Sequence, residues 1–281
     1  MIAIIANPKA RRFSINKLMQ IKQIFNDSFK KVDIFYTKRP MDGLEIAKQI
    51  KSSYKIVCSY GGDGTLNEVV NGIVDTDVKL GVLPCGTSDV FALELGLQRN
   101  AINCAKRYLK QNYVNVHLGE LNNRYFILMA GVGIDAAAVR DVNHSLKEYS
   151  GKLSYFLSGI KSVKSFDRLI SVKTPFGEKL CYSVIAANAK KYGGDFSIFK
   201  KANCFEKNLY VCLFHTKKSL LNIAKSAMFL YFGINSNLHE CFFADEIFID
   251  SFDIPIQVDG DFAGFSPARI KASKKCVKVL I

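Results

Sequence analysis

The segment YGGDGTLNEVVNG, residues 60–72, decides the fold of this chain. It follows a short apolar run and begins a segment whose apolar residues have helical spacing. Gly61, Gly62 and Gly64 let the backbone come within hydrogen-bond distance of a phosphate, because no Cβ intervenes. The N–H groups at the start of a helix favour negative charge. The segment therefore predicts a phosphate-binding loop between a strand and a helix.

Asp63 is unexpected in a loop that binds only anions. A carboxylate beside phosphates is useful if it holds Mg²⁺ or accepts the proton of an attacking hydroxyl. The alternative is a glycine-rich turn in which Asp63 caps the helix. Thr65, Asn67 and Glu68 follow at a spacing that favours the phosphate site.

The first 118 residues alternate strand-like and helix-like patterns. This alternation predicts an α/β unit with a mostly parallel sheet, whose ligands bind beyond the carboxyl ends of the strands. The loops expected there are Asn7-Pro8, Thr37, residues 61–65 and residues 85–87. The predicted strands are residues 2–6, 32–36, 55–60 and 80–83, and the predicted helices are residues 15–25, 44–50 and 66–73.

Beyond residue 118 the pattern changes to short strands with few helical crossovers, which predicts a largely antiparallel, β-rich unit. Two helices are expected in it, at residues 146–163 and 220–232. The first combines an apolar stripe with Lys147, Lys152, Lys161 and Lys164, which favours contact with an anionic membrane in a salt-dependent manner. The other interpretation is that the stripe packs on the protein core. The predicted strands are residues 125–130, 169–172, 182–187, 209–214, 246–250 and 255–258.

The composition excludes several classes of protein. The 281-residue chain has a formal net charge of +14, which indicates either an anionic partner or simply a well-solvated surface. Its eight cysteines form no Cys-x-x-Cys pair, and Cys58, Cys181 and Cys212 lie in apolar runs that predict buried, reduced thiols of a cytoplasmic protein. The sequence has no Gly-x-Ser-x-Gly elbow and no Gly-x-Gly-x-x-Gly motif, and we expect neither a secretion leader nor a membrane-spanning run.

The glycine segment closely resembles the signature of the diacylglycerol kinase catalytic family, which includes sphingosine kinases and bacterial lipid kinases. Further matches lie in order along the whole chain. They are Asn7-Pro8, LGVLPCGTSDVFA (residues 80–92), GVGIDA (131–136), Asn188 with Gly193-Gly194, and VDGD (258–261). Each match is weak alone, and the ordered set is specific.

This resemblance implies an NAD-kinase- and phosphofructokinase-like nucleotide-binding unit, residues 1–118 with 264–281 returning to it, and a sandwich-like lipid-substrate unit, residues 119–263. It implies an ATP-dependent lipid kinase, most simply one that converts diacylglycerol to phosphatidic acid, with Mg²⁺ arriving with ATP. Asp63 would serve the phosphate and metal site, and Asp261 occupies the position of the family's proton-accepting Glu. The residues expected to contact ATP are Asn7, Thr37, Gly61, Gly62, Gly64, Thr65, Asn67, Glu68, Gly86 and Thr87.

The cysteines and the basic residues predict a cytoplasmic protein attached peripherally to anionic membranes, with no nucleic-acid partner. The resemblance is also compatible with a homodimer. The sequence identifies neither the lipid nor the oligomeric state. Two other functions stay open, namely an NAD kinase, which shares the Gly-Gly-Asp-Gly loop, and a lipid- or nucleotide-binding protein with reduced catalysis.

The chain departs from the family pattern at several positions. Ala10-Arg11 replaces Ser-Gly of the nucleotide motif, and Asp89 and Val90 replace Asn-Asp. Glu206 and Asp261 replace an Asp and a Glu. Because the family's structural Mg²⁺ depends on the positions now held by Val90 and Glu206, no tightly held structural Mg²⁺ is expected.

Overall fold

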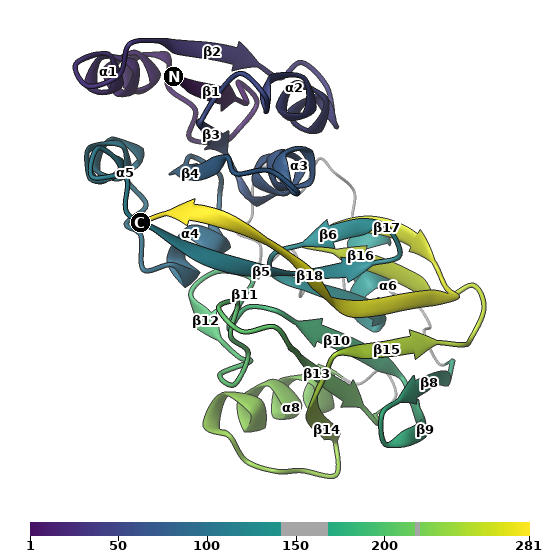
Figure 1. Cartoon of the computed structure of the whole chain (residues 1–281). Helices are drawn as coiled ribbons and strands as arrows, with labels where there is room; N and C mark the ends of the chain where they lie inside the picture. The colour runs from purple at the N-terminus through teal and green to yellow at the C-terminus, as the bar shows by residue number, and fades with distance from the viewer. Residues whose placement is uncertain (142–167, 217–219) are drawn as a thin grey trace. The chain divides into compact units, whose positions relative to one another are not determined.

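The computed structural model describes residues 1–141, 168–216 and 220–281. The chain divides into two units (Figure 1). The first contains Met1–His117 and Lys275–Ile281, and the second contains Leu118–Lys274. The predicted helix at residues 146–163 and its four lysines lie outside the described residues.

The first unit is a parallel α/β unit, as predicted. Its strands run in the order β2-β1-β3-β4, and the last residues of the C-terminal strand β18 lie beside β4. Its elements are β1 (Ile2–Ala6), α1 (Ile15–Asn26), β2 (Val32–Tyr36), α2 (Asp42–Ile50), β3 (Ile56–Gly61), α3 (Asp63–Ile73), β4 (Lys79–Pro84), α4 (Val90–Glu94) and α5 (Ala101–Tyr108).

Two helix pairs cover this sheet. The central strands β1 and β3 are buried along their whole length, which is why their residues form continuous apolar runs rather than alternating ones. Helix α1 packs beside α5, and α2 packs beside α3. Figure 1 shows the two pairs on opposite faces of the sheet. The carboxyl ends of β1, β3 and β4 therefore lie side by side, where ligands bind in such folds.

The second unit is β-rich and mainly antiparallel. One sheet has the order β14-β13-β10-β7-β16-β17, and the first part of β18 pairs with β15, which pairs with β8. Its elements are β5 (Tyr113–Leu121, which begins in the first unit), β6 (Arg124–Phe126), β7 (Met129–Gly133), α6 (Ile134–Asp141), β8 (Ile170–Thr174), β9 (Gly177–Cys181), β10 (Ser183–Ala187), β11 (Lys191–Tyr192), β12 (Phe196–Ser197), β13 (Leu209–Phe214), α8 (Leu220–Phe232), β14 (His239–Ala244), β15 (Glu246–Ile249), β16 (Pro255–Val258), β17 (Asp261–Phe265) and β18 (Ala268–Leu280).

The strand predicted at residues 125–130 is wrong as a single element, because the chain leaves β6 at Phe126 and enters β7 at Met129. The cause is Asp259. Its carboxylate accepts hydrogen bonds from the backbone N–H groups of Ile127, Leu128 and Met129 at 2.9–3.0 Å. These groups are thereby turned toward a side chain, and they cannot donate to a strand ladder.

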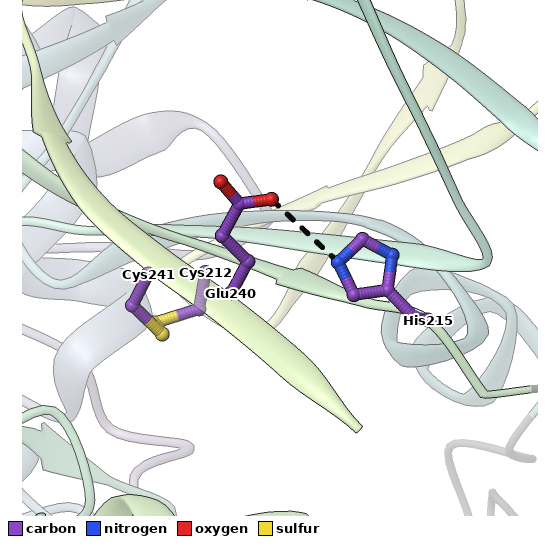
Figure 2. Close-up of a disulfide and its surroundings, with 4 residues drawn as sticks. All are labelled: Cys212, His215, Glu240 and Cys241. Carbon is purple, nitrogen blue, oxygen red and sulfur yellow. Dashed lines mark ion pairs between the residues drawn. A yellow bond between two sulfur atoms is a disulfide. The ribbon is translucent and has the colours of Figure 1, made fainter. Parts of the chain in front are cut away.

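The prediction that Cys212 is a reduced thiol is also wrong. Cys212 and Cys241 form a disulfide between β13 and β14 (Figure 2). The register of these strands places the two residues directly opposite each other, with their Cα atoms 4.2 Å apart. Only strand register shows this, because the two residues are 29 positions apart in the chain. Cys58 and Cys181 are buried free thiols, as predicted.

No helix in the described ranges is long and apolar enough to cross a membrane.

A buried polar cluster centres on Asp135, at the start of α6. Its carboxylate accepts hydrogen bonds from Tyr192 Oη at 2.6 Å and from Gln257 Nε2 at 2.7 Å. A Cβ at residue 131 would lie 2.0 Å from Asp135 Oδ2, so Gly131 leaves the space that this carboxylate occupies. Burial raises the pKa of Asp135, and the two hydrogen bonds offset only part of that effect.

This raised pKa predicts a pH-dependent stability. A carboxyl group whose pKa is higher in the folded state stabilises the fold fully below its unfolded pKa of about 3.9, and this contribution is lost as the pH rises through the folded value. The free energy of unfolding of the wild type, minus that of Asp135→Asn, should therefore fall as the pH rises from about 4. Urea unfolding of both proteins over that range measures this difference. A pH-independent difference would contradict the prediction.

Candidate active site

The loops that follow β3 and β4 touch each other through their backbones. A Cβ at residue 86 would lie 2.5 Å from Gly62 Cα, and a Cβ at residue 62 would lie 3.2 Å from Gly86 Cα. No other residue type fits at Gly86 without moving the backbone of the glycine loop. The structure thus brings together two predicted segments, residues 61–65 and Gly86-Thr87.

The start of α3 carries the features expected of a phosphate site. Gly62 is the N-cap residue, and no side chain caps the helix there. Asn7, at the end of β1, donates from Nδ2 to Thr65 Oγ1 at 2.9 Å. Gly61 lies close under the same threonine, since a Cβ at residue 61 would approach Thr65 Cβ to 2.6 Å. A helix start with main-chain N–H groups and no Cβ in front of them suits a phosphate oxygen.

The Asp63 carboxylate reaches the helix that follows β4. Its carboxylate accepts hydrogen bonds from the N–H groups of Val90 (Oδ2, 3.1 Å) and Phe91 (Oδ1, 3.1 Å), the first residues of α4. The side chain is 4% exposed. Asp63 therefore joins the glycine loop to the segment after β4, and the negative charge is favourable at a helix start.

Glu68 makes the corresponding contact with α2. Its two carboxylate oxygens accept from Met41 N and Gly43 N, each at 2.9 Å. Of the other residues expected to contact ATP, Thr37 is buried next to the end of β1, where its N–H donates to Ala6 O at 2.9 Å. Asn67 is buried on α3, and Thr87 is half-buried beside Gly86.

Sequence reasoning missed Arg12. Arg12 donates from Nε to Gly86 O at 2.7 Å, and its Nη2 is paired with Asp89 Oδ2. Asp89 is 3% exposed and also accepts from Gly86 N at 2.8 Å. The pair holds the loop that touches Gly62. No sequence signal separates Arg12 from Arg11, because the partner lies 77 positions away.

Cys85 lies in the same loop but is not a candidate nucleophile. Burial, together with the nearby Asp89 carboxylate, raises the pKa of its thiol to about 12. A thiol with this pKa is protonated at neutral pH, and the thiolate is the nucleophilic form.

In the second unit, the VDGD segment contains two aspartates, Asp259 and Asp261, whose surroundings differ. Asp259 is buried and holds the link between β6 and β7, as described above. Asp261 begins β17, its side chain is 42% exposed, and its Oδ2 lies 3.9 Å from Arg124 Nη2. Asn188, another matched residue, is buried and donates from Nδ2 to Ile127 O at 2.9 Å.

The described part of the chain contains no group of three or more His, Cys, Asp or Glu side chains arranged to hold a metal ion. Glu206, at one of the changed positions, is exposed and accepts from Asn203 Nδ2 at 2.9 Å.

The chain thus combines a glycine loop at the carboxyl end of a parallel sheet with an antiparallel β-rich unit. Residues 1–121 match the diacylglycerol kinase catalytic domain, and residues 129–281 match the YegS C-terminal NAD kinase beta sandwich-like domain. The chain therefore belongs to the diacylglycerol kinase catalytic family.

The individual proteins that the chain resembles are also named diacylglycerol kinases. A diacylglycerol kinase of Bacillus subtilis (strain 168) is 27% identical over 280 residues, which cover 95% of this chain and 91% of the relative. One of Staphylococcus haemolyticus is 28% identical over 267 residues, 87% of this chain and 77% of the relative. A crystal structure assigned as a diacylglycerol kinase of Bacillus anthracis str. Sterne shares the fold, with a TM-score of 0.82, 22% identity, and coverage of 99% of this chain and 96% of that one.

The Arg12–Asp89 pair yields a stability prediction. Arg12→Ala should lower the free energy of unfolding by about 1–3 kcal/mol, because it leaves the buried Asp89 carboxylate without its cation. Asp89→Asn should lower the free energy of unfolding less in the Arg12→Ala variant than in the wild type. A double-mutant cycle by urea unfolding measures this coupling.

Arg11→Ala is the matched control, because Arg11 is an exposed neighbour of the same type. Its effect should stay within about 0.5 kcal/mol. Equal effects of the Arg11 and Arg12 substitutions, or additive effects of the Arg12 and Asp89 substitutions, would contradict the assignment.

Proposed function

We propose that the protein is an ATP- and Mg²⁺-dependent diacylglycerol kinase that transfers the γ-phosphate to the lipid hydroxyl and forms phosphatidic acid. The observation that carries this proposal is the contact between Gly62 and Gly86 beside the uncapped start of α3. It provides a main-chain surface for phosphates without a side chain in the way. The names of the relatives supply the lipid.

The residues around the glycine contact fit a triphosphate. The main chain at Gly62, Gly64 and Thr65 would bind phosphate oxygens. Asn7 holds the Thr65 hydroxyl at 2.9 Å, and so sets its orientation. Thr37, Asn67, Glu68, Gly86 and Thr87 complete the proposed ATP-binding set.

Asp63 fits a metal-linked role as well as its structural one. Its carboxylate accepts hydrogen bonds from the N–H groups at the start of α4, which fix its position beside the glycine loop. Asp63 would therefore be held in place while it binds, directly or through water, the Mg²⁺ that arrives with ATP. The metal supplies neutralisation of the charge on the transferred phosphoryl group.

Asp261 would accept the proton of the lipid hydroxyl. In this step the hydroxyl oxygen forms a bond to the γ-phosphorus, the bond from that phosphorus to the β,γ-bridging oxygen breaks, and ADP leaves. The exposure of Asp261 is compatible with access by a substrate. Its side chain is one methylene shorter than Glu, so it must approach the hydroxyl more closely.

The direct test is transfer of labelled phosphate from ATP to dioleoylglycerol in detergent micelles, with NAD⁺ as the competing acceptor. We expect labelled phosphatidic acid and no labelled NADP⁺. Transfer to NAD⁺ alone would establish an NAD kinase. Binding of ATP without transfer to any lipid would establish a binding protein.

Asp63→Asn should reduce lipid phosphorylation by roughly 10²–10⁴-fold. The structure shows that this change is not structurally neutral, although the side chains are nearly isosteric. An Asn places an NH₂ group against the N–H of Val90 or Phe91, where the carboxylate now accepts. Thermal unfolding and ATP affinity should therefore be measured beside turnover. Near-wild-type turnover would remove Asp63 from the mechanism.

A further inference from the structure

Helix α8 has an apolar face turned to solvent. Its exposed residues recur every three or four positions, which places them on one side of the helix. The large ones include Leu221, Met228 and Phe232, with 63%, 48% and 65% exposure. The opposite side contains Ser226 and Leu230, which are buried. The outer face of α8 consists of Leu221, Ala224, Lys225, Met228, Tyr231 and Phe232.

Most of the charged side chains on and beside this face are positive. Lys225 is the only charged residue of α8, and no Asp or Glu occurs between Glu206 and Glu240. At the C-terminal end of the helix, Lys200 Nζ lies 4.3 Å from the centre of the Tyr231 ring. A pocket of about 620 Å³ adjoins that end, and its lining contains Lys200 and Lys201 together with one acidic residue, Glu240.

This combination fits the surface of a bilayer better than a protein partner. An aromatic ring with a lysine over it, beside leucine, methionine and phenylalanine, has the composition of helices that lie in the membrane interface. Helix α8 has 13 residues, about 20 Å at 1.5 Å per residue, which is too short to cross a hydrocarbon layer of about 30 Å. The excess of lysine over acidic residues at this end of α8 favours anionic lipid headgroups.

We propose that the outer face of α8 is a membrane-docking surface that inserts shallowly into an anionic bilayer. The proposal goes beyond the proposed function and rests on it only because a lipid kinase must reach a substrate that resides in the bilayer. It assigns this contact to α8 rather than to the lysines of residues 146–163.

The test is co-sedimentation of the full chain with vesicles of phosphatidylglycerol and phosphatidylcholine, and with vesicles of phosphatidylcholine alone. The wild type should bind the anionic vesicles, and added salt should weaken this binding. Phe232→Asp should weaken it by about tenfold or more, because a ring that enters the interface is replaced by a charge. Lys225→Glu should weaken it by about fivefold or more and reduce its salt dependence.

Phe252→Asp is the matched control, because Phe252 is also a highly exposed phenylalanine, at 69%, and lies outside α8. Its vesicle binding should equal that of the wild type. The proposal would be overturned if the Phe232 and Phe252 variants lost vesicle binding equally, or if neither variant lost it.

Two further measurements test whether the outer face of α8 is instead covered by the chain itself or by a second copy of it. Phe232→Asp should leave the thermal midpoint unchanged, and a clear drop would show that the face is covered by the chain itself. Light scattering should give the same mass for the variant and the wild type. A smaller mass for the variant would show that the face binds a second copy.

Vesicle binding is measured without ATP, so its outcome is independent of catalysis. Binding through α8 by a protein that phosphorylates no lipid would support this inference and overturn the proposed function. If the protein phosphorylates lipid but its vesicle binding does not change with the α8 substitutions, the proposed function would be supported and this inference would be overturned.

Discussion

The backbone contact between Gly62 and Gly86 is the constraint on which the rest of the first unit depends. Two loops can meet at main-chain distance only if neither has a side chain at the point of contact. Side chains from elsewhere then hold the two loops in place. Asp63 binds the start of α4, and Arg12 with Asp89 fixes the Gly86 loop. A phosphate surface built from main-chain groups needs this support, because it has no side chains of its own to position it.

Carboxylates in the matched motifs do structural work that motif reading does not show. Asp63, Glu68 and Asp259 each accept hydrogen bonds from at least two backbone N–H groups of a distant segment. Each one replaces the missing partners of a helix start or of an irregular link between strands. A substitution at such a position changes the local fold as well as any chemistry, so activity measurements there need a stability measurement beside them.

The structure explains how the chain accommodates two departures from the family pattern, at Asp89 and Val90. At Val90 it is the backbone N–H that binds Asp63, so the link between these segments does not depend on the Val90 side chain. Asp89 brings a buried negative charge, and Arg12 neutralises it. The contact between the two loops therefore persists although the Asn-Asp pair has been replaced.

The sequence by itself determined the parallel α/β unit, the β-rich second unit, the family and the glycine loop, because strand and helix periodicity and glycine spacing are local properties. It did not show that Asp259 holds the link between β6 and β7, that Arg12 pairs with Asp89, or that Cys212 is bonded to Cys241. It predicted a helix at residues 220–232, but not which side of that helix faces solvent. Only the tertiary structure decided these points, because each depends on which segments far apart in the chain become neighbours.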